Sequence, residues 1–128
     1  MSHYAVTNPA TGEVEETFAT YSDEQVETAL DGAQIAFEQW GRTSSKAERS
    51  ALLRRVADLY EERKEELADI IHHEMGKLPE ECLAEVEFSG AIYRYYADNG
   101  EFFLEDAPIQ REAEGSAVIR KLPIGPLF

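Results

Sequence analysis

The stretch KAERSALLRRVADLYEERKEELADIIHHEMGK, residues 46–77, is the longest strongly periodic segment of the chain. Its apolar side chains recur every three or four positions, the spacing that gathers them on one side of an α-helix. They are Leu52, Leu53, Val56, Leu59, Tyr60, Leu67, Ile70, Ile71 and Met75. The opposite side is almost entirely charged. The pattern predicts one long amphipathic helix, or two helices end to end.

The two ends of this helix carry signals of their own. Ser45 is placed to accept a hydrogen bond from the first turn while Glu48 reaches back to Ser45, a reciprocal cap. Gly76 is expected to stop the helix. Between Tyr60 and Leu67 the apolar spacing lapses into six charged residues. Either a bend or a solvated face explains that lapse, and the sequence leaves both open.

Length and composition limit the class of protein. The chain has 128 residues, enough for one domain with a modest core, and 43% of them are hydrophobic. No apolar run approaches the roughly 20 residues of a membrane helix. With 26 acidic and 12 basic residues the formal net charge is -14, so phosphate backbones and anionic membranes would be repelled. We expect neither a nucleic acid nor a membrane as partner.

The N-terminus and the cysteine count bear on the compartment. Residues 1–4 lack the charged and apolar regions of a signal peptide. Cys82 is the only cysteine, so no internal disulfide is possible, which fits a reducing environment. We therefore expect a cytoplasmic protein.

Two shorter elements precede the periodic stretch. Residues 4–7 and 13–19 are expected to form a β-hairpin around a turn that contains proline and glycine. Ser22 is expected to cap a helix with small apolar residues on one side. That helix is predicted to pack closely against a neighbouring helix, with Phe37 and Trp40 as its large anchors.

A third helix and a second hairpin are expected after the periodic stretch. Pro79 suits the first turn of the helix. Its inward residues are predicted to be Leu83, Val86, Tyr93, Tyr96, Ala97 and Phe103. After Pro108 the pattern becomes extended, and residues 109–113 and 116–122 predict a hairpin that turns at Glu114 and Gly115. The apolar run that ends at Phe128 has no polar cap, so we expect a chain cut short of its proper end.

Candidate catalytic and metal-binding residues are few. His72 and His73 are adjacent on a helix and point about 100° apart, so they cannot share one metal from that helix. Carboxylates around Cys82 oppose the thiolate, so we interpret this cysteine as a buried structural residue. Tyr93, Tyr95 and Tyr96 have no basic neighbour except Arg94, which favours packing over base stacking. We assign no catalytic, cofactor-binding or metal-binding residue to the 128 residues.

The order of the segments resembles a known family. It runs from NPATGEV (8–14) through the capped stretch 46–77 and YRYYADN (93–99) to the late hairpin and LPIG (122–125). This order is similar to the N-terminal segment of the aldehyde dehydrogenase superfamily. Within it, the chain most resembles the NAD(P)-dependent succinate-semialdehyde dehydrogenases.

The resemblance implies an α/β fold of the aldehyde dehydrogenase kind. This chain would be its N-terminal helical part plus two β-hairpins, cut at the start of the dinucleotide-binding sheet. Residues 1–107 would then belong to the NAD(P)-binding domain, 108–122 would form an oligomerisation hairpin, and 123–128 would begin the first strand of the sheet. Some family members bind a monovalent cation at a place that corresponds to the surroundings of Thr7 and Glu101.

The resemblance also implies an enzyme that oxidises an aldehyde, with succinate semialdehyde the expected substrate, NAD or NADP the cofactor, and a dimer or tetramer the assembly. In the family a cysteine attacks the aldehyde, an asparagine and a backbone N–H hold the oxyanion, hydride passes to NAD(P)⁺, and a glutamate activates water. None of those motifs lies in this sequence, and Cys82 does not match the nucleophile's motif. The 128 residues alone are expected to be inactive.

A second hypothesis is a non-catalytic helical module for interaction or oligomerisation. Such a module should be a compact, well-behaved species. A dehydrogenase segment should instead expose its apolar run 122–128 and associate.

Overall fold

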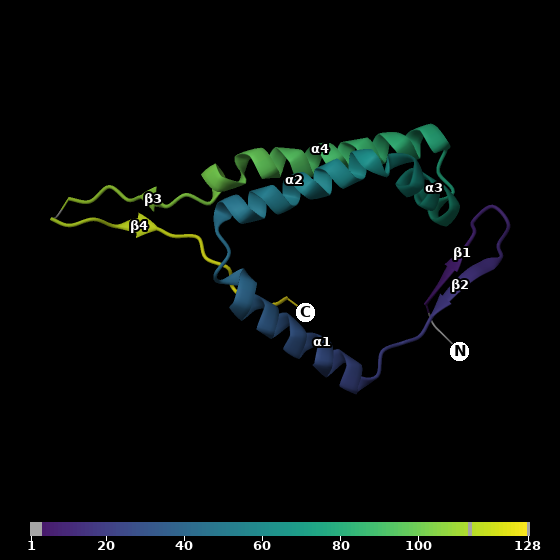
Figure 1. Ribbon diagram of the computed structural model, residues 1–128, viewed down its shortest axis with the longest axis horizontal. Coiled ribbons are helices and arrows are strands. Elements are labelled where there is room, and N and C mark those ends of the chain that lie inside the picture. The colour runs from purple at the N-terminus through teal and green to yellow at the C-terminus, as the bar shows by residue number, and fades with distance from the viewer. Residues whose placement is uncertain (1–3, 113, 128) are drawn as a thin grey trace.

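Two long helices lying side by side dominate the structure, a computed structural model that describes residues 4–112 and 114–127. They are α2 (Lys46–Glu62) and α4 (Pro79–Phe103), and α3 (Lys64–Met75) packs against α4 at one end of the pair (Figure 1). No helix within the described residues is both long and apolar enough to cross a membrane.

The periodic stretch forms two helices that meet at Arg63. The backbone of Arg63, at φ -116° and ψ 22°, leaves the helical region there. The Glu48 N–H donates to the Ser45 hydroxyl at 3.1 Å, and the Ser45 N–H donates to the Glu48 carboxylate at 2.7 Å. Gly76 ends α3 at φ 69°. The reciprocal cap and the glycine stop are therefore confirmed, and of the two explanations left open for the charged lapse, the bend is correct.

A small core lies where α2, α3 and α4 meet. Its buried residues are Ala68, Cys82 and Val86, and the half-buried side chains around them are Tyr60, Leu67, Ile71 and Leu83. Ala57 and Ala97 are buried further along the helix pair. Gly90 faces Tyr60 so closely that a methyl group on Gly90 would lie 3.2 Å from the Tyr60 Cβ. Small side chains thus let the two long helices approach, as ridge-and-groove packing requires.

The inward face of α4 is partly as expected. Val86 and Ala97 are buried, and Leu83 and Tyr93 are half-buried. The prediction for two others was wrong, since the exposed fraction of Tyr96 is 52% and that of Phe103 is 36%. The reason is the narrow contact of a single helix pair, which covers only one stripe of α4.

The first hairpin has the expected topology. Strands β1 (Tyr4–Thr7) and β2 (Val14–Phe18) pair antiparallel, and β2 is one residue shorter at each end than expected. Gly12 adopts a φ of 76° in the turn, a conformation that glycine accepts without strain. The hairpin approaches the end of α3, since a methyl group on Gly76 would lie 2.8 Å from the Pro9 Cγ.

Helix α1 (Asp23–Ala36) continues into a π-helical turn, η1 (Phe37–Gly41). Ser22 caps it as expected, with its hydroxyl accepting from the Gln25 N–H at 3.3 Å. The predicted packing against a neighbouring helix was wrong. No residue of α1 is buried, the helix stands apart from the α2–α4 pair (Figure 1), and Trp40 is half exposed. The physical reason is that α1 has no other helix within reach among the described residues.

The second hairpin is shorter than expected and begins earlier. Strands β3 (Ala107–Pro108) and β4 (Val118–Ile119) pair antiparallel. The expected strands 109–113 and 116–122 were therefore wrong in their bounds, because beyond the Ile109 N–H to Ala117 carbonyl bond at 2.9 Å no further backbone bond pairs the described strands. Ala113, in the expected first strand, lies outside the described residues.

The expected opening strand at 123–128 does not form among residues 123–127, and Phe128 lies outside the described residues. A strand needs a neighbour to satisfy its backbone, and the described part of the chain provides none there. The apolar side chains of this run are 72–87% exposed; they are Leu122, Ile124 and Leu127.

Candidate functional site

Cys82 lies in the first turn of α4 and is fully buried, with an exposed fraction of 0%. It packs in the core with Ala68 and Val86. A thiol that solvent does not reach cannot attack a dissolved aldehyde. The expectation of a buried, structural cysteine is confirmed.

The two histidines at the end of α3 each have a backbone partner. His72 Nδ1 lies 2.6 Å from the Lys77 carbonyl oxygen, and His73 Nδ1 lies 2.9 Å from the Asp69 carbonyl oxygen. Their rings meet edge to face with centroids 5.6 Å apart. Within the described residues, no three side chains of His, Cys, Asp or Glu are grouped to hold a metal ion. The two histidines therefore make hydrogen bonds to backbone carbonyl groups at the C-terminal end of α3.

The pKa of His73 is raised above its ordinary value of 6.5, first by the hydrogen bond to the Asp69 carbonyl and then by the Asp69 carboxylate. Protonated His73 also suits the negative end of α3. Because the folded-state pKa is raised, this contribution to stability is complete below pH 6.5 and disappears as the pH rises through the folded-state value.

We expect Asp69→Asn to lower the His73 pKa only part of the way toward 6.5, because the carbonyl partner remains. An NMR titration of the ring protons measures this. Asp23→Asn, at the distant start of α1, serves as the control and should leave the pKa unchanged. An unaltered His73 pKa in Asp69→Asn would contradict the assignment.

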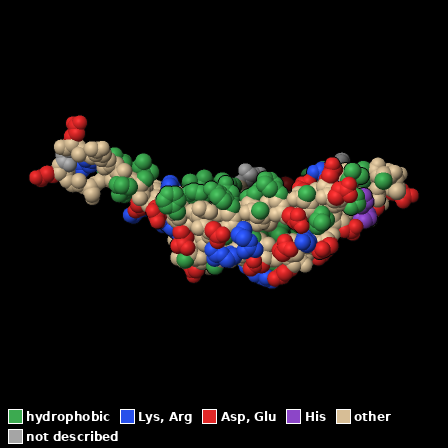
Figure 2. Space-filling model, turned by 90° about the horizontal axis from the view of Figure 1, so that it is seen from above, with side chains coloured by type: hydrophobic (Ala, Val, Ile, Leu, Met, Phe, Trp, Pro, Cys, Tyr) green, Lys and Arg blue, Asp and Glu red, His purple; other side chains and the backbone are tan. Residues whose placement is uncertain are grey.

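The tyrosine cluster divides between two sides of α4. Tyr93 packs against Tyr60 with ring centroids 5.2 Å apart, as the packing hypothesis predicted. Tyr95 and Tyr96 instead contact each other at 5.4 Å on the exposed side. They form part of an exposed apolar surface, here called the aromatic face, which Figure 2 shows along one side of the helix pair. Its residues are Phe88, Ile92, Tyr95, Tyr96, Phe102 and Phe103.

Thr7 and Glu101 do not lie near each other in this structure. Thr7 ends β1, in the hairpin that approaches the end of α3, whereas Glu101 lies in the last turn of α4, at the opposite end of the helix pair (Figure 1). The described residues therefore do not assemble the cation site that the resemblance suggested.

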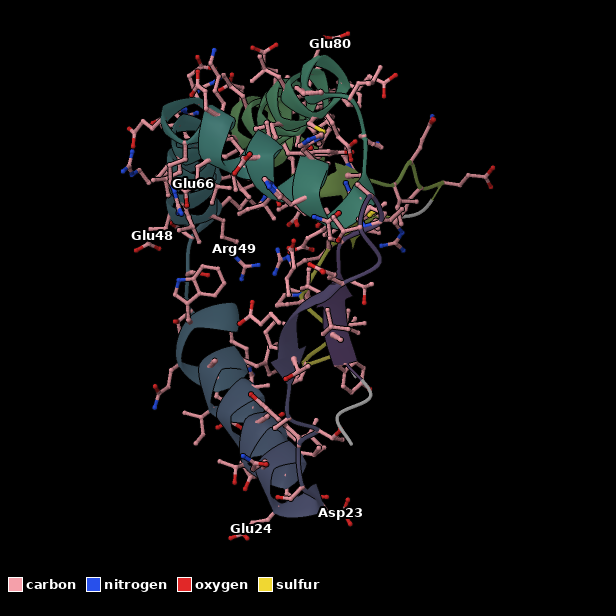
Figure 3. The ribbon with its side chains drawn as sticks, turned by 90° about the vertical axis from the view of Figure 1, so that its right-hand side faces the viewer. Asp23, Glu24, Glu48, Arg49, Glu66 and Glu80 are labelled. Carbon is pink, nitrogen blue, oxygen red and sulfur yellow. The ribbon has the colours of Figure 1, made fainter. Side chains whose placement is uncertain are left out.

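The sequence interpretation missed a cluster of basic side chains beside the start of α2. Figure 3 shows Arg49 between α2 and the end of α1. A cavity of about 300 Å³ opens there, here called the basic pocket. Its lining residues are Gly41, Arg42, Ser44, Lys46, Arg49, Leu104, Lys121, Leu122 and Pro123. The occurrence of Arg42, Lys46 and Arg49 close together in the sequence was the available signal, but no sequence pattern brings Lys121 to them.

Comparison with known proteins matches the whole chain to one family. Residues 1–128 fit the model described as "Aldehyde dehydrogenase family". A Deinococcus radiodurans protein named "Succinate-semialdehyde dehydrogenase [NADP(+)]" is 37% identical over 98% of this chain and is itself covered to 26%. The mitochondrial succinate-semialdehyde dehydrogenase of Arabidopsis thaliana is 32% identical, with 94% of this chain and 22% of that protein covered. The chain thus spans about a quarter of these relatives.

Solved structures agree with the fold. Succinic semialdehyde dehydrogenase from Streptococcus pyogenes, in complex with NADP⁺, superimposes with a TM-score of 0.83 at 31% identity, over 90% of this chain and 25% of that one. Betaine aldehyde dehydrogenase from Staphylococcus aureus, with NAD⁺, gives 0.82 at 26% identity, over 93% and 24%.

The described residues do not fit a dinucleotide by themselves. A strand that leads into a glycine turn and a helix N-terminus is what cradles a pyrophosphate, and the described residues after β4 form no such arrangement. The expected α/β fold is nevertheless confirmed by the structural matches. The family match over residues 1–128 and these relatives together show that the chain belongs to the aldehyde dehydrogenase family and corresponds to its N-terminal segment.

Proposed function

We propose that these residues serve as the N-terminal portion of an oxidoreductase that converts succinate semialdehyde to its acid with NADP⁺. The observation that carries the proposal is the similarity to relatives in several bacteria whose shared name combines this aldehyde with NADP⁺. They are 36–37% identical over 94–98% of the chain. We propose NADP⁺ rather than NAD⁺ because NADP⁺ is the cofactor in the names of these relatives.

The distribution of apolar surface supports a role as part of a larger body. Large side chains remain exposed along the aromatic face, with Phe88 at 67% and Phe102 at 69%. The core beneath is built from small residues such as Ala68 and Cys82. A self-contained interaction module, the competing hypothesis, would bury more of its large apolar side chains, because exposed patches of this kind promote association.

The domain assignment and the assembly follow as parts of the same proposal. Residues 1–107 would join the NAD(P)-binding domain, 108–122 would form an oligomerisation hairpin, and 123–128 would open the dinucleotide-binding sheet. The β3–β4 hairpin projects away from the helices (Figure 1) and offers unpaired strand edges to a second subunit of a dimer or tetramer. A single buried free cysteine, Cys82, fits the reducing cytoplasm.

Activity measurements test the proposal. We expect the full-length protein to form NADPH with succinate semialdehyde, and the isolated 128 residues to form none, because their one thiol is buried. The kcat/KM for succinate semialdehyde should exceed the kcat/KM for acetaldehyde by about tenfold or more. The kcat/KM with NADP⁺ should exceed the kcat/KM with NAD⁺ by about the same factor. Acetaldehyde tests recognition of the distal carboxylate, which it lacks. Turnover by the isolated residues, or a full-length preference for NAD⁺, would contradict the proposal.

A further inference from the structure

The lysines and arginines of the described residues fall into two groups. Most lie within ion-pair distance of a carboxylate; these are Arg54, Arg55, Arg63, Lys64, Lys77, Arg94 and Arg120. Five others have no carboxylate within 4.0 Å anywhere in the described part of the chain. One of them, Arg111, lies in the loop between β3 and β4. The remaining four are Arg42, Lys46, Arg49 and Lys121, and all four line the basic pocket.

This clustering is unexpected in so acidic a chain. Acidic residues outnumber basic ones by 26 to 12, so a cation placed without selection would tend to have a carboxylate nearby. Like charges gathered around one cavity repel each other, and that repulsion costs stability unless an anion compensates it. The pocket therefore has the charge of a site that is complete only with an anion bound.

Neutral partners hold two of these cations in place without cancelling their charge. The Arg49 Nε donates to the Ser44 hydroxyl at 2.9 Å, and its Nη2 donates to the Gly41 carbonyl. The same guanidinium lies 5.2 Å from the centre of the Trp40 ring. The Lys121 Nζ donates to the Phe103 carbonyl at 2.5 Å. Side chains fixed in this way lose less freedom when they bind a ligand.

Asp106, a carboxylate that the charge of Lys46 influences, is already paired with another residue. Both oxygens of Asp106 accept from Arg120, at 2.7 to 3.2 Å. The pKa of Asp106 is lowered chiefly by these hydrogen bonds, and the charge of Lys46 is the smallest contribution. Asp106 therefore belongs to the base of the β3–β4 hairpin, and it does not neutralise the pocket.

We propose that the basic pocket binds a phosphate or pyrophosphate group carried by a small organic molecule. An arginine fork and lysine ammonium groups suit phosphate oxygens, and several cations match a ligand with two or more negative charges. The start of α2 is already capped by Ser45 and the Glu48 carboxylate, so the positive charge of the pocket comes from its four side chains. Leu104, Leu122 and Pro123 form an apolar wall for the organic part. The proposal does not rest on the dehydrogenase activity.

Calorimetric titration of the full-length protein with pyrophosphate tests this proposal, in saturating NADP⁺ so that a cofactor site is already filled. We expect binding that Lys46→Gln and Lys121→Gln each weaken by about tenfold, the usual size of one charge-assisted contact. Both lysines are exposed, so each variant should still fold. Arg55→Gln is the matched control, because Arg55 also lies on α2 but pairs with Glu62 at 2.7 Å. It should leave the affinity unchanged, and acetate, with one charge, should not bind.

Three results would overturn the proposal. One is the absence of binding heat with pyrophosphate in the unaltered protein. Another is an equal loss of affinity in Arg55→Gln, which would indicate a diffuse charge effect. The third is a full-length crystal structure in which carboxylate side chains from elsewhere in the polypeptide occupy the pocket. Because the readout is calorimetric, each of these leaves the proposed oxidation of succinate semialdehyde standing.

Discussion

Replacing Val86 with aspartate is expected to unfold the helical part of the 128-residue chain. Val86 is 2% exposed and sits with Ala68 and Cys82 in the only core cluster of the described residues. A carboxylate buried there without a partner costs roughly 3–5 kcal/mol. That reaches the lower end of the stability of a small domain, about 5–15 kcal/mol, and the core of this chain is small. Circular dichroism should show loss of most helical signal.

Phe88→Asp is the matched control for this experiment. Phe88 lies two positions further along α4, receives the same new charge, and is 67% exposed. We expect its melting temperature to stay close to that of the unaltered chain, because no buried contact is lost. Similar melting of the two variants would mean that the core is not where the structure places it.

Introducing negative charges on the aromatic face is expected to improve the solution behaviour of the isolated chain but to destabilise the full-length protein. In the 128 residues, the double variant Ile92→Asp, Tyr95→Asp should reduce self-association, because both side chains are exposed there, at 41% and 54%. In the full-length protein the same change should destabilise by about 3 kcal/mol or more and remove activity, because later polypeptide is proposed to cover this face.

Sedimentation velocity measures the first effect, and thermal unfolding with an NADPH assay measures the second. Glu81→Gln provides the control on the same helix, since it alters charge about two turns before Phe88, the first residue of the aromatic face, and should change neither result. A full-length double variant with normal stability and turnover would show that the aromatic face stays in water, and the proposal of a covering polypeptide would then be wrong.

Local signals in the sequence were enough to predict most of the helices. The caps at Ser22 and Ser45, the stop at Gly76 and the start at Pro79 all appear as expected. Each depends on hydrogen bonds or backbone preferences within four residues. The same is true of the first hairpin, whose turn is specified by its own residues.

Predictions that needed a tertiary partner were less successful. The apolar stripe of α1 predicted a neighbouring helix, yet Trp40 is half exposed and no long helix of the described residues packs against α1. Periodicity says which side of a helix is apolar, but the partner that covers it can lie outside the segment. The prediction that Tyr96 faces inward was wrong for the same reason.

The basic pocket shows the limit of reading residues in order. Arg42 and Lys121 are separated by most of the chain, and only the return of the segment after β4 brings them to one cavity. Nothing in the spacing of either residue points to the other. The carboxylate partners of the remaining cations could not be predicted from the sequence either. An example is the ion pair between Arg54 on α2 and Asp98 on α4, at 2.8 Å.

The break at Arg63 and the pairing of α2 with α4 have a consequence for synthesis. The two helices are joined through one short helix, so their contacts close early and with little loop entropy. As the N-terminal segment of its family, this region leaves the ribosome before the polypeptide proposed to cover it. The helix pair can thus fold during synthesis, while α1 and the aromatic face stay exposed to solvent and chaperones until later residues are synthesised.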